Sequence, residues 1–128
     1  MKYISTRGND GPLGYEEALL SGLARDGGLY LPTSYPRFSD KEIAAMRGLS
    51  YAELAGLVMA RFTDGEIEAD ELTAMAADAY AGFDDPAVAP LRHLTGDIHV
   101  LELFHGPTIA FKDYAMQFLA RAFDWALR

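Results

Sequence analysis

The segment from Asp113 to Arg128 constrains the fold more than any other, because hydrophobic residues cover more than one side of the helix it predicts. Apolar residues recur there at helical spacing, at Ala115, Phe118, Leu119, Ala122, Phe123 and Ala126. Four more widen the apolar surface beyond one stripe: Tyr114, Met116, Trp125 and Leu127. A helix that is apolar on several sides needs packing partners on several sides.

A predicted strand and a loop lead into this helix. The strand is predicted over 98–104 and the loop over 105–112. A strand, a loop and a helix form half of a β-α-β unit, in which a parallel strand returns beside the first. We therefore expect an α/β domain that continues beyond Arg128, with this chain as a truncated N-terminal part. The alternative is that the helix packs on the N-terminal residues or on a second copy of the chain.

The residues before this unit predict short strands and helices. Residues 2–6 predict a strand, and residues 8–12 predict a turn. A helix is predicted over 15–26 and is expected to end at Gly27. An extended segment over 29–32 follows it. Capping-box patterns at Ser39 and Ser50 predict a short helix to Arg47 and a longer one that ends at Asp64.

Hydrophobic periodicity gives two of these helices a buried face. The longer helix carries Leu54, Leu57, Val58 and Phe62 on or near one face. A third helix over 70–80 directs Leu72, Met75, Ala76 and Ala79 inward, and a loop with Asp84, Asp85 and two prolines follows it. We predict an α/β protein with a small, mainly helical domain over 1–88 and the incomplete start of a second domain over 89–128.

Composition and charge exclude several classes of partner. The formal net charge of −8 repels phosphate backbones and anionic lipid, so neither nucleic acid nor a membrane surface is expected to bind. The chain has no cysteine, and therefore no disulfide or thiolate chemistry. It lacks an apolar run of about 20 residues and a signal-peptide core. A cytoplasmic protein is the expectation.

Lys112 is the strongest candidate for chemistry, because it lies where the loop meets the final helix. The N-terminus of a helix carries a partial positive charge that disfavours an ammonium ion. Apolar neighbours such as Phe111 favour the neutral amine in the same way. Only the neutral amine attacks a carbonyl, so this setting suits a lysine nucleophile. A solvated surface lysine fits the same local pattern, and the position alone does not decide between them.

Three sequence segments resemble those of threonine synthases. The run from Leu103 to Leu119, LFHGPTIAFKDYAMQFL, is similar to the family's cofactor-lysine segment, in which the lysine of AFKD binds pyridoxal phosphate. Residues 3–8, YISTRG, resemble the family's opening segment, and 22–32, GLARDGGLYLP, resemble its next signature. The resemblance covers most of the chain, although family members are several times longer.

The resemblance implies a fold, a cofactor and a reaction. The second domain would begin a pyridoxal-phosphate-dependent domain of fold type II, similar to the tryptophan synthase β subunit. Lys112 would form a Schiff base with pyridoxal 5′-phosphate, with Phe111 and Asp113 as neighbours. The enzyme would be a carbon–oxygen lyase that converts O-phospho-L-homoserine and water to L-threonine and phosphate, the last step of threonine biosynthesis. The freed Lys112 amine would shuttle a proton between substrate carbons.

Part of such a site is missing from the sequence. Enzymes of this fold type hold the cofactor phosphate in a glycine-rich loop, and Gly106 is a lone turn glycine. The chain alone is therefore expected to be inactive, and no role is assigned to His105 or Thr108. Two alternatives remain: a related phospholyase that acts on another O-phosphorylated amino acid, and a non-catalytic interaction module derived from the enzyme's N-terminus.

Other polar residues favour structural explanations. His93, His99 and His105 recur every six residues, but this spacing specifies no convergent metal geometry, and no metal is expected. The acidic run over 64–71 lacks the ligand spacing of a calcium loop and suits a solvated helix start. Ser5, Thr6 and Arg7 fit an exposed strand end better than a phosphate site, and Trp125 fits a core or interface position. Oligomeric state is not predicted.

Overall fold

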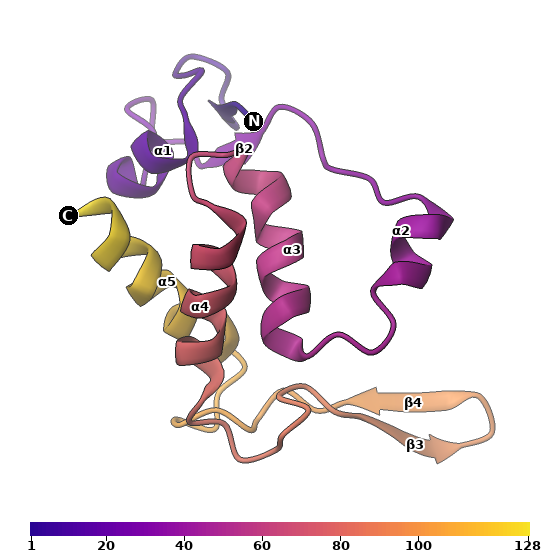
Figure 1. Cartoon of the computed structure of the whole chain (residues 1–128). Helices are drawn as coiled ribbons and strands as arrows, with labels where there is room; N and C mark the ends of the chain where they lie inside the picture. The colour runs from indigo at the N-terminus through magenta and orange to yellow at the C-terminus, as the bar shows by residue number, and fades with distance from the viewer.

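A computed structural model describes residues 1–128 as a small mixed α/β structure in which helices dominate (Figure 1). The elements follow in the order β1 (Tyr3–Ser5), α1 (Tyr15–Ser21), β2 (Tyr30–Pro32), α2 (Asp40–Ala45), α3 (Tyr51–Thr63), α4 (Ala69–Tyr80), β3 (Leu91–Thr95), β4 (Ile98–Leu101) and α5 (Asp113–Ala126). Neither α5 nor any shorter helix has the length and apolar content to span a membrane.

Helices α3 and α4 form the closest helix pair of the molecule. Each begins as predicted, and Ser50 caps α3 by accepting a hydrogen bond from the Glu53 N–H. The residues of α4 that are buried are the four predicted to point inward. The predicted buried face of α3 is wrong, because smaller residues face the core instead, including Ala52, Ala55, Gly56 and Ala60. Small side chains let the two helix backbones approach each other closely.

Helix α5 completes the core, since it packs on α4 along one side and on α1 along another. Phe118 and Ala122 join Ile67, Leu72 and the inward residues of α4 in one buried cluster, and Trp125 packs against it. In Figure 1 the helix runs from the lower end of α4 up toward α1. Met116 on α5 and Leu127, the residue that follows the helix, remain largely exposed. The predicted helix is therefore confirmed, and it packs back on the N-terminal part.

Two partly exposed carboxylates order the segment around β1 and β2, which pair antiparallel. Asp26 accepts hydrogen bonds from the Ser5 hydroxyl at 2.6 Å and from the backbone N–H groups of Asn9 and Gly28. Asp10 accepts from the Tyr30 hydroxyl at 2.6 Å. These contacts give Ser5 a structural role, but Ser5 is 3% exposed, so the expected exposed strand end is wrong for this residue.

The predicted helix over 15–26 is too long. Helix α1 ends at Ser21, because Gly22 adopts a left-handed backbone with φ of 66°. The residues beyond it turn back, and Leu23 bridges to Leu29. A glycine five residues earlier than expected thus terminates the helix.

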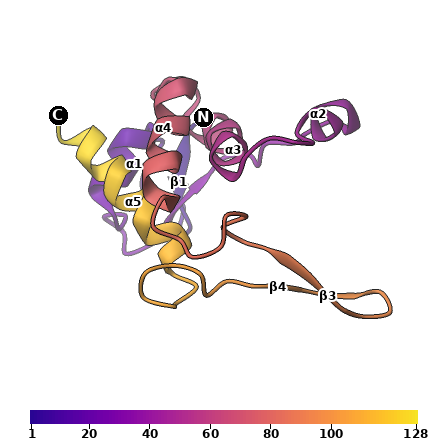
Figure 2. The ribbon, with the colours of Figure 1, turned by 60° about the horizontal axis from the view of Figure 1, so that its bottom comes forward.

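Strands β3 and β4 form a two-stranded antiparallel hairpin that extends away from the helices (Figures 1 and 2). The sequence predicts a strand over 98–104, and the structure ends it at Leu101; β3 is an additional strand that the sequence analysis missed. The two-residue turn at Gly96 and Asp97 joins them, with Gly96 at a positive φ. The parallel partner of a β-α-β unit does not occur within the chain and stays a prediction.

We predict that Gly56→Ala destabilises the α3–α4 pair. An added Cβ would lie 2.3 Å from the Thr73 Oγ1 and 2.9 Å from its Cα, so the helices must separate. Overpacking of this kind costs about 2 kcal/mol, more than the gain of about 1 kcal/mol from the better helix propensity of alanine. Urea unfolding should show the loss. Gly82→Ala is the control, because its added Cβ meets nothing within 4 Å; equal midpoints for the two variants would contradict this account.

Candidate functional site

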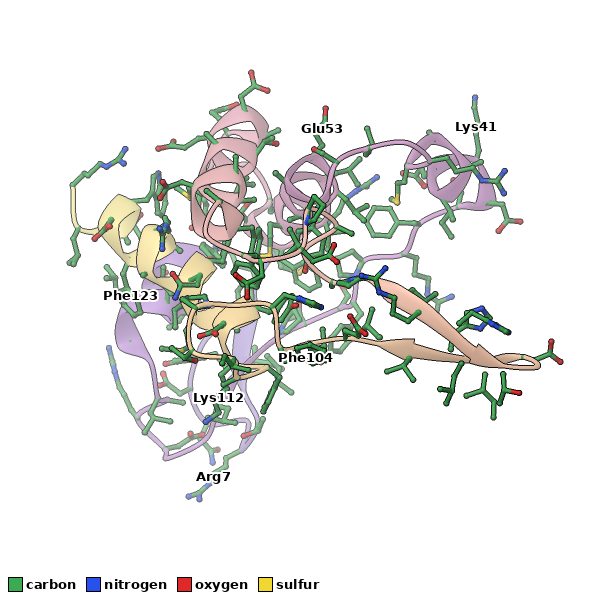
Figure 3. All side chains as sticks on the ribbon, turned by 90° about the horizontal axis from the view of Figure 1, so that it is seen from below. Arg7, Lys41, Glu53, Phe104, Lys112 and Phe123 are labelled. Carbon is green, nitrogen blue, oxygen red and sulfur yellow. The ribbon has the colours of Figure 1, made fainter.

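Lys112 lies at the N-cap position of α5, at the end of the loop over 105–112. Its side chain is exposed and makes neither a hydrogen bond nor an ion pair within the chain. Figure 3 labels it beside this loop, well separated in that view from Lys41 on α2. Lys112 thus presents a free primary amine at the start of a helix that the core holds, next to an exposed Phe111.

Asp113, the next residue, is the one charged side chain of the molecule that is fully buried, with 4% of its surface exposed. Thr108 donates a hydrogen bond to each carboxylate oxygen of Asp113. The Thr108 backbone N–H donates to Oδ2 and the Thr108 hydroxyl donates to Oδ1, each at 2.8 Å. Hydrogen bonds to a carboxylate are stronger than those between neutral groups, especially away from water. Asp113 therefore ties the loop to the first turn of α5.

Gly106 makes room for this carboxylate. A Cβ at that position would lie 2.4 Å from the Asp113 Cβ and 2.5 Å from its Oδ2. The Gly106 carbonyl also accepts the Ile109 N–H at 3.0 Å, which closes a tight turn. Gly106 thus has a packing role against Asp113.

Two β-branched residues near Lys112 adopt left-handed backbone conformations. Ile109 has a φ of 64° and Val88 a φ of 61°. This region is strained for β-branched side chains, and such strain persists only where the surroundings impose it. Ile109 is 72% exposed, so burial of its own side chain does not impose the left-handed conformation. The hydrogen bonds of Asp113 and Gly106 impose this conformation.

Tyr114 anchors the start of α5 to the loop that carries Val88. Its hydroxyl donates to the Val88 carbonyl at 2.7 Å, and its own carbonyl accepts the Tyr80 hydroxyl at 2.9 Å. Phe83 lies between the two tyrosine rings in edge-to-face contact with both. Burial raises the pKa of Tyr80 to about 12, with the nearby Tyr51 and Tyr114 acting in the same direction. A hydrogen-bonded aromatic column thus connects α4 to the Lys112 segment.

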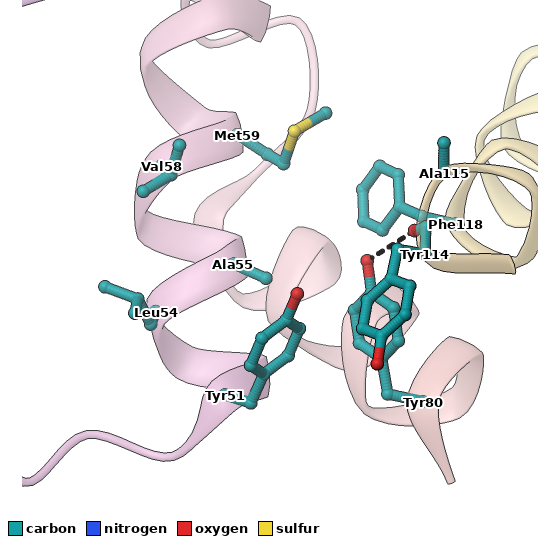
Figure 4. A pocket seen from close by; sticks show the side chains of 9 residues that line it. All are labelled: Tyr51, Leu54, Ala55, Val58, Met59, Tyr80, Tyr114, Ala115 and Phe118. Carbon is teal, nitrogen blue, oxygen red and sulfur yellow. Dashed lines mark hydrogen bonds between the residues drawn. The ribbon is translucent and has the colours of Figure 1, made fainter. Parts of the chain in front are cut away.

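An apolar cavity of about 350 Å³ opens beside this column (Figure 4). Residues from α3, α4 and α5 line it: Tyr51, Leu54, Ala55, Val58, Met59, Tyr80, Tyr114, Ala115 and Phe118. In the close-up, Leu54 and Val58 extend from α3 away from the core, which explains why the predicted face of that helix is only partly covered. Lys112 is not among the lining residues, so this cavity is separate from the amine.

The remaining sequence candidates disperse over the structure. His93 and His99 face each other across the hairpin with ring centroids 5.2 Å apart, while His105 contacts the Glu102 carboxylate at 2.8 Å. No three histidine, aspartate or glutamate side chains gather as metal ligands do. Arg7 donates to the Asp26 carbonyl at 2.9 Å.

Glu66, from the acidic run, caps a helix other than the one expected. Its carboxylate accepts the backbone N–H groups of Tyr15 and Glu16 at the start of α1. The two bonds satisfy donors that a helix N-terminus otherwise leaves free, and the negative charge suits the helix dipole.

Comparison with known proteins gives this geometry a family. A family model described as the threonine synthase N terminus matches residues 2–80. Threonine synthase from Pseudomonas aeruginosa is 52% identical over 127 residues, which make up 99% of this chain and 27% of that protein. The crystal structure of PLP-bound threonine synthase from Brucella melitensis superposes with a TM-score of 0.95 at 55% identity, over 99% of this chain and 27% of that one. Human threonine synthase-like 1 is 39% identical over 112 residues, 85% of this chain and 15% of that protein.

The chain belongs to the threonine synthase family. It spans about a quarter of the length of the relatives to which it is most similar here. The family model ends at Tyr80, the last residue of α4, whereas the likeness to the Brucella melitensis threonine synthase extends over the hairpin and α5. The resemblance drawn from the sequence is thus confirmed for the whole chain, including the segment that carries Lys112.

The structure adds two residues to the description of the Lys112 segment. The sequence analysis names Asp113 only as a neighbour of Lys112 and assigns no role to Thr108; the structure joins both in one buried contact. A signal was available in the spacing of Gly106, Thr108 and Asp113, because a threonine shortly before a helix-start aspartate often makes local hydrogen bonds.

We predict that Ile109→Gly gives a more stable protein than Ile109→Ala. Both changes remove the same exposed side chain, but only glycine adopts a φ of 64° without steric cost. The free energy of unfolding of the glycine variant should be about 1 kcal/mol higher than that of the alanine variant. Urea unfolding measures this difference, and the reverse order would mean that Ile109 is not strained.

We predict that Tyr80 makes stability fall at alkaline pH. Its pKa is raised from 10 to about 12, so the folded state retains the phenol proton more tightly than the unfolded chain. The resulting stabilisation is complete below about pH 10 and is lost as the pH rises toward 12. Tyr80→Phe should reduce this alkaline loss, and at neutral pH should cost about 1 kcal/mol for the lost hydrogen bond.

Urea unfolding over a series of alkaline pH values tests this. Tyr35→Phe is the matched control, because Tyr35 is 67% exposed and should leave the pH profile unchanged. An unchanged profile for Tyr80→Phe would refute the assignment.

Proposed function

We propose that this chain provides the cofactor lysine of a threonine synthase, and that Lys112 holds pyridoxal 5′-phosphate through its Nζ. One observation carries the proposal: the run around Lys112 places a free amine on a fixed loop, within a chain that belongs to the threonine synthase family. The PLP-bound state of the Brucella melitensis relative supports the choice of cofactor. The proposed reaction converts O-phospho-L-homoserine and water to L-threonine and phosphate.

The residues around Lys112 fit a covalently held cofactor. The amine is exposed and has no carboxylate partner within the chain. A primary amine attacks a carbonyl to form a Schiff base. Phe111, the residue before it, is 67% exposed and would be a neighbour of the attachment point. The adjacent Asp113 charge is directed away, into its contacts with Thr108.

When bound, the cofactor supplies an electron sink that stabilises negative charge on a substrate carbon. The chain's own contribution is positional. Lys112 would hold the cofactor, and its Nζ would move a proton from one substrate carbon to another. Proton transfer by a positioned amine requires that the backbone at Lys112 be fixed.

Gly106 does not supply a phosphate-binding loop in this proposal. It packs against Asp113, which would repel a phosphate group, and no glycine-rich run surrounds it. We therefore place the phosphate-binding groups outside these 128 residues, in the domain that begins near residue 89, and we expect the chain by itself to be inactive. The division of the chain near residue 88 is part of the same proposal.

A second function in the same class has support from one relative. Human threonine synthase-like 1 is 39% identical to most of this chain, so the N-terminal segment also occurs in a protein with a different name. A phospholyase that acts on another O-phosphorylated amino acid is therefore the alternative. Phosphate release from O-phosphohomoserine, compared with release from phosphoserine and phosphothreonine, distinguishes the two.

The proposal predicts covalent attachment at Lys112. The sequence contains three lysines, Lys2, Lys41 and Lys112, which makes the attachment site easy to map. After borohydride reduction of the protein expressed from its complete reading frame, peptide mapping should find the pyridoxyl group on Lys112. Lys112→Ala should abolish trapping and lower phosphate release by about 1,000-fold or more.

Lys41→Ala provides the control, since Lys41 is also exposed and lies in the first turn of a helix. It should retain both trapping and activity. A pyridoxyl group on Lys2 or Lys41, or on no residue of this chain, would refute the role given to Lys112.

A further inference from the structure

We propose that Asp113 and Thr108 are positioning residues, which hold the loop over 106–112 in its strained conformation and thereby fix Lys112 for attachment of the cofactor. This inference rests on the function proposed for Lys112. It concerns how the protein maintains the geometry of that residue, and the two residues act without contact to substrate.

Asp113 is isolated among exposed residues. Its neighbours from 107 to 112 are all exposed, yet its carboxylate is 96% buried in the same short segment. A buried carboxylate is costly unless hydrogen bonds compensate for its lost hydration. Both bonds come from Thr108, so the charge is stable only while this residue stays in place.

These two bonds also fix the residues that they enclose. Between Thr108 and Asp113 the chain contains Ile109, whose left-handed backbone is strained, and Lys112. The Ala110 carbonyl accepts the Asp113 N–H at 3.0 Å, and the Lys112 carbonyl accepts the Met116 N–H at 2.9 Å. Thr108 and Asp113 therefore close both ends of the segment that presents the amine. Without this closure Ile109 would relax to a negative φ, and the backbone of Lys112 would rotate with it.

Apart from this pair, the segment is held only by backbone hydrogen bonds, such as the one from the Ile109 N–H to the Gly106 carbonyl. The side chains of Ile109 and Phe111 are 72% and 67% exposed, so burial does not restrain them. Gly106 contributes the space for the carboxylate but no side chain. The Tyr114 hydroxyl anchors the helix after the loop and makes no hydrogen bond to residues 107–112. The clamp between Asp113 and Thr108 is thus the main side-chain restraint on the loop.

Thr108→Val tests the clamp, because valine has nearly the same shape and lacks only the hydroxyl donor. The protein is expressed from its complete reading frame, freed of cofactor and mixed with pyridoxal phosphate. The rate of attachment is followed by visible absorbance, and borohydride trapping confirms the site. We expect Thr108→Val to slow attachment by about 10-fold and to shift the pH midpoint of the absorbance. Thr108→Ser should restore both, since it retains the hydroxyl.

A second readout does not depend on the cofactor. The backbone N–H of Thr108 is bonded to Asp113, so it should be protected from hydrogen exchange. Asp113→Ala should remove this protection, whereas Asp113→Asn, which still offers an oxygen acceptor, should retain most of it.

Gly56→Ala is the control for lost stability, because it weakens the α3–α4 pair and lies outside the Lys112 segment. Gly56→Ala should lose as much stability as Thr108→Val or more, and yet attach the cofactor at the unchanged rate. The proposal is overturned if Thr108→Val attaches cofactor at the parent rate, or if Gly56→Ala slows attachment as much. A pyridoxyl group on another lysine would instead overturn the function proposed for Lys112, so the two failures are distinguishable.

Discussion

The packing of α5 against α4 is the contact on which the Lys112 segment depends. Phe118 and Ala122 insert into the core beside Leu72 and Ala76, and the hydrogen bond from Tyr80 to the Tyr114 carbonyl fixes the first turn of α5 relative to α4. Burial of these apolar surfaces supplies the free energy that orders the helix. One end of the same helix therefore serves the core, and the other end presents the amine.

Close approach of helix backbones makes this core possible in a short chain. Gly56 lies against the backbone of Thr73, and alanines fill most of the remaining contact between α3 and α4. The larger residues of α3, including Leu54 and Val58, are left to line the cavity beside α5. A second apolar hollow of about 440 Å³ lies between α1, β2 and α5. The helix thus has apolar space on two flanks, in agreement with the wide apolar surface of its sequence.

Local signals in the sequence predict most elements, and tertiary contacts explain the failures. The capping boxes at Ser39 and Ser50 locate two helix starts, and the periodicity of α4 identifies its buried residues, because both depend on neighbours in the sequence. The face of α3 was wrong because Gly56, a residue without hydrophobic weight, sets the contact with α4. Gly22 and the Gly96–Asp97 turn were available as local signals for the end of α1 and for the hairpin.

The site shows the same division between local and distant causes. The motif makes Lys112 the candidate for cofactor attachment. The contacts of Asp113 depend on burial, which the sequence does not reveal, because an aspartate at a helix start is more often solvated and interacts with the helix dipole. Here Gly106 lies where a side chain would occupy the position of the carboxylate. The buried charge, the strained Ile109 and the exposed Lys112 therefore form one arrangement: the protein concentrates its rigid contacts on the residues flanking the amine and leaves the amine itself free. A lysine that must bind, release and bind again needs this combination, because a contact to its own nitrogen would compete with the chemistry, whereas contacts to the backbone on either side do not.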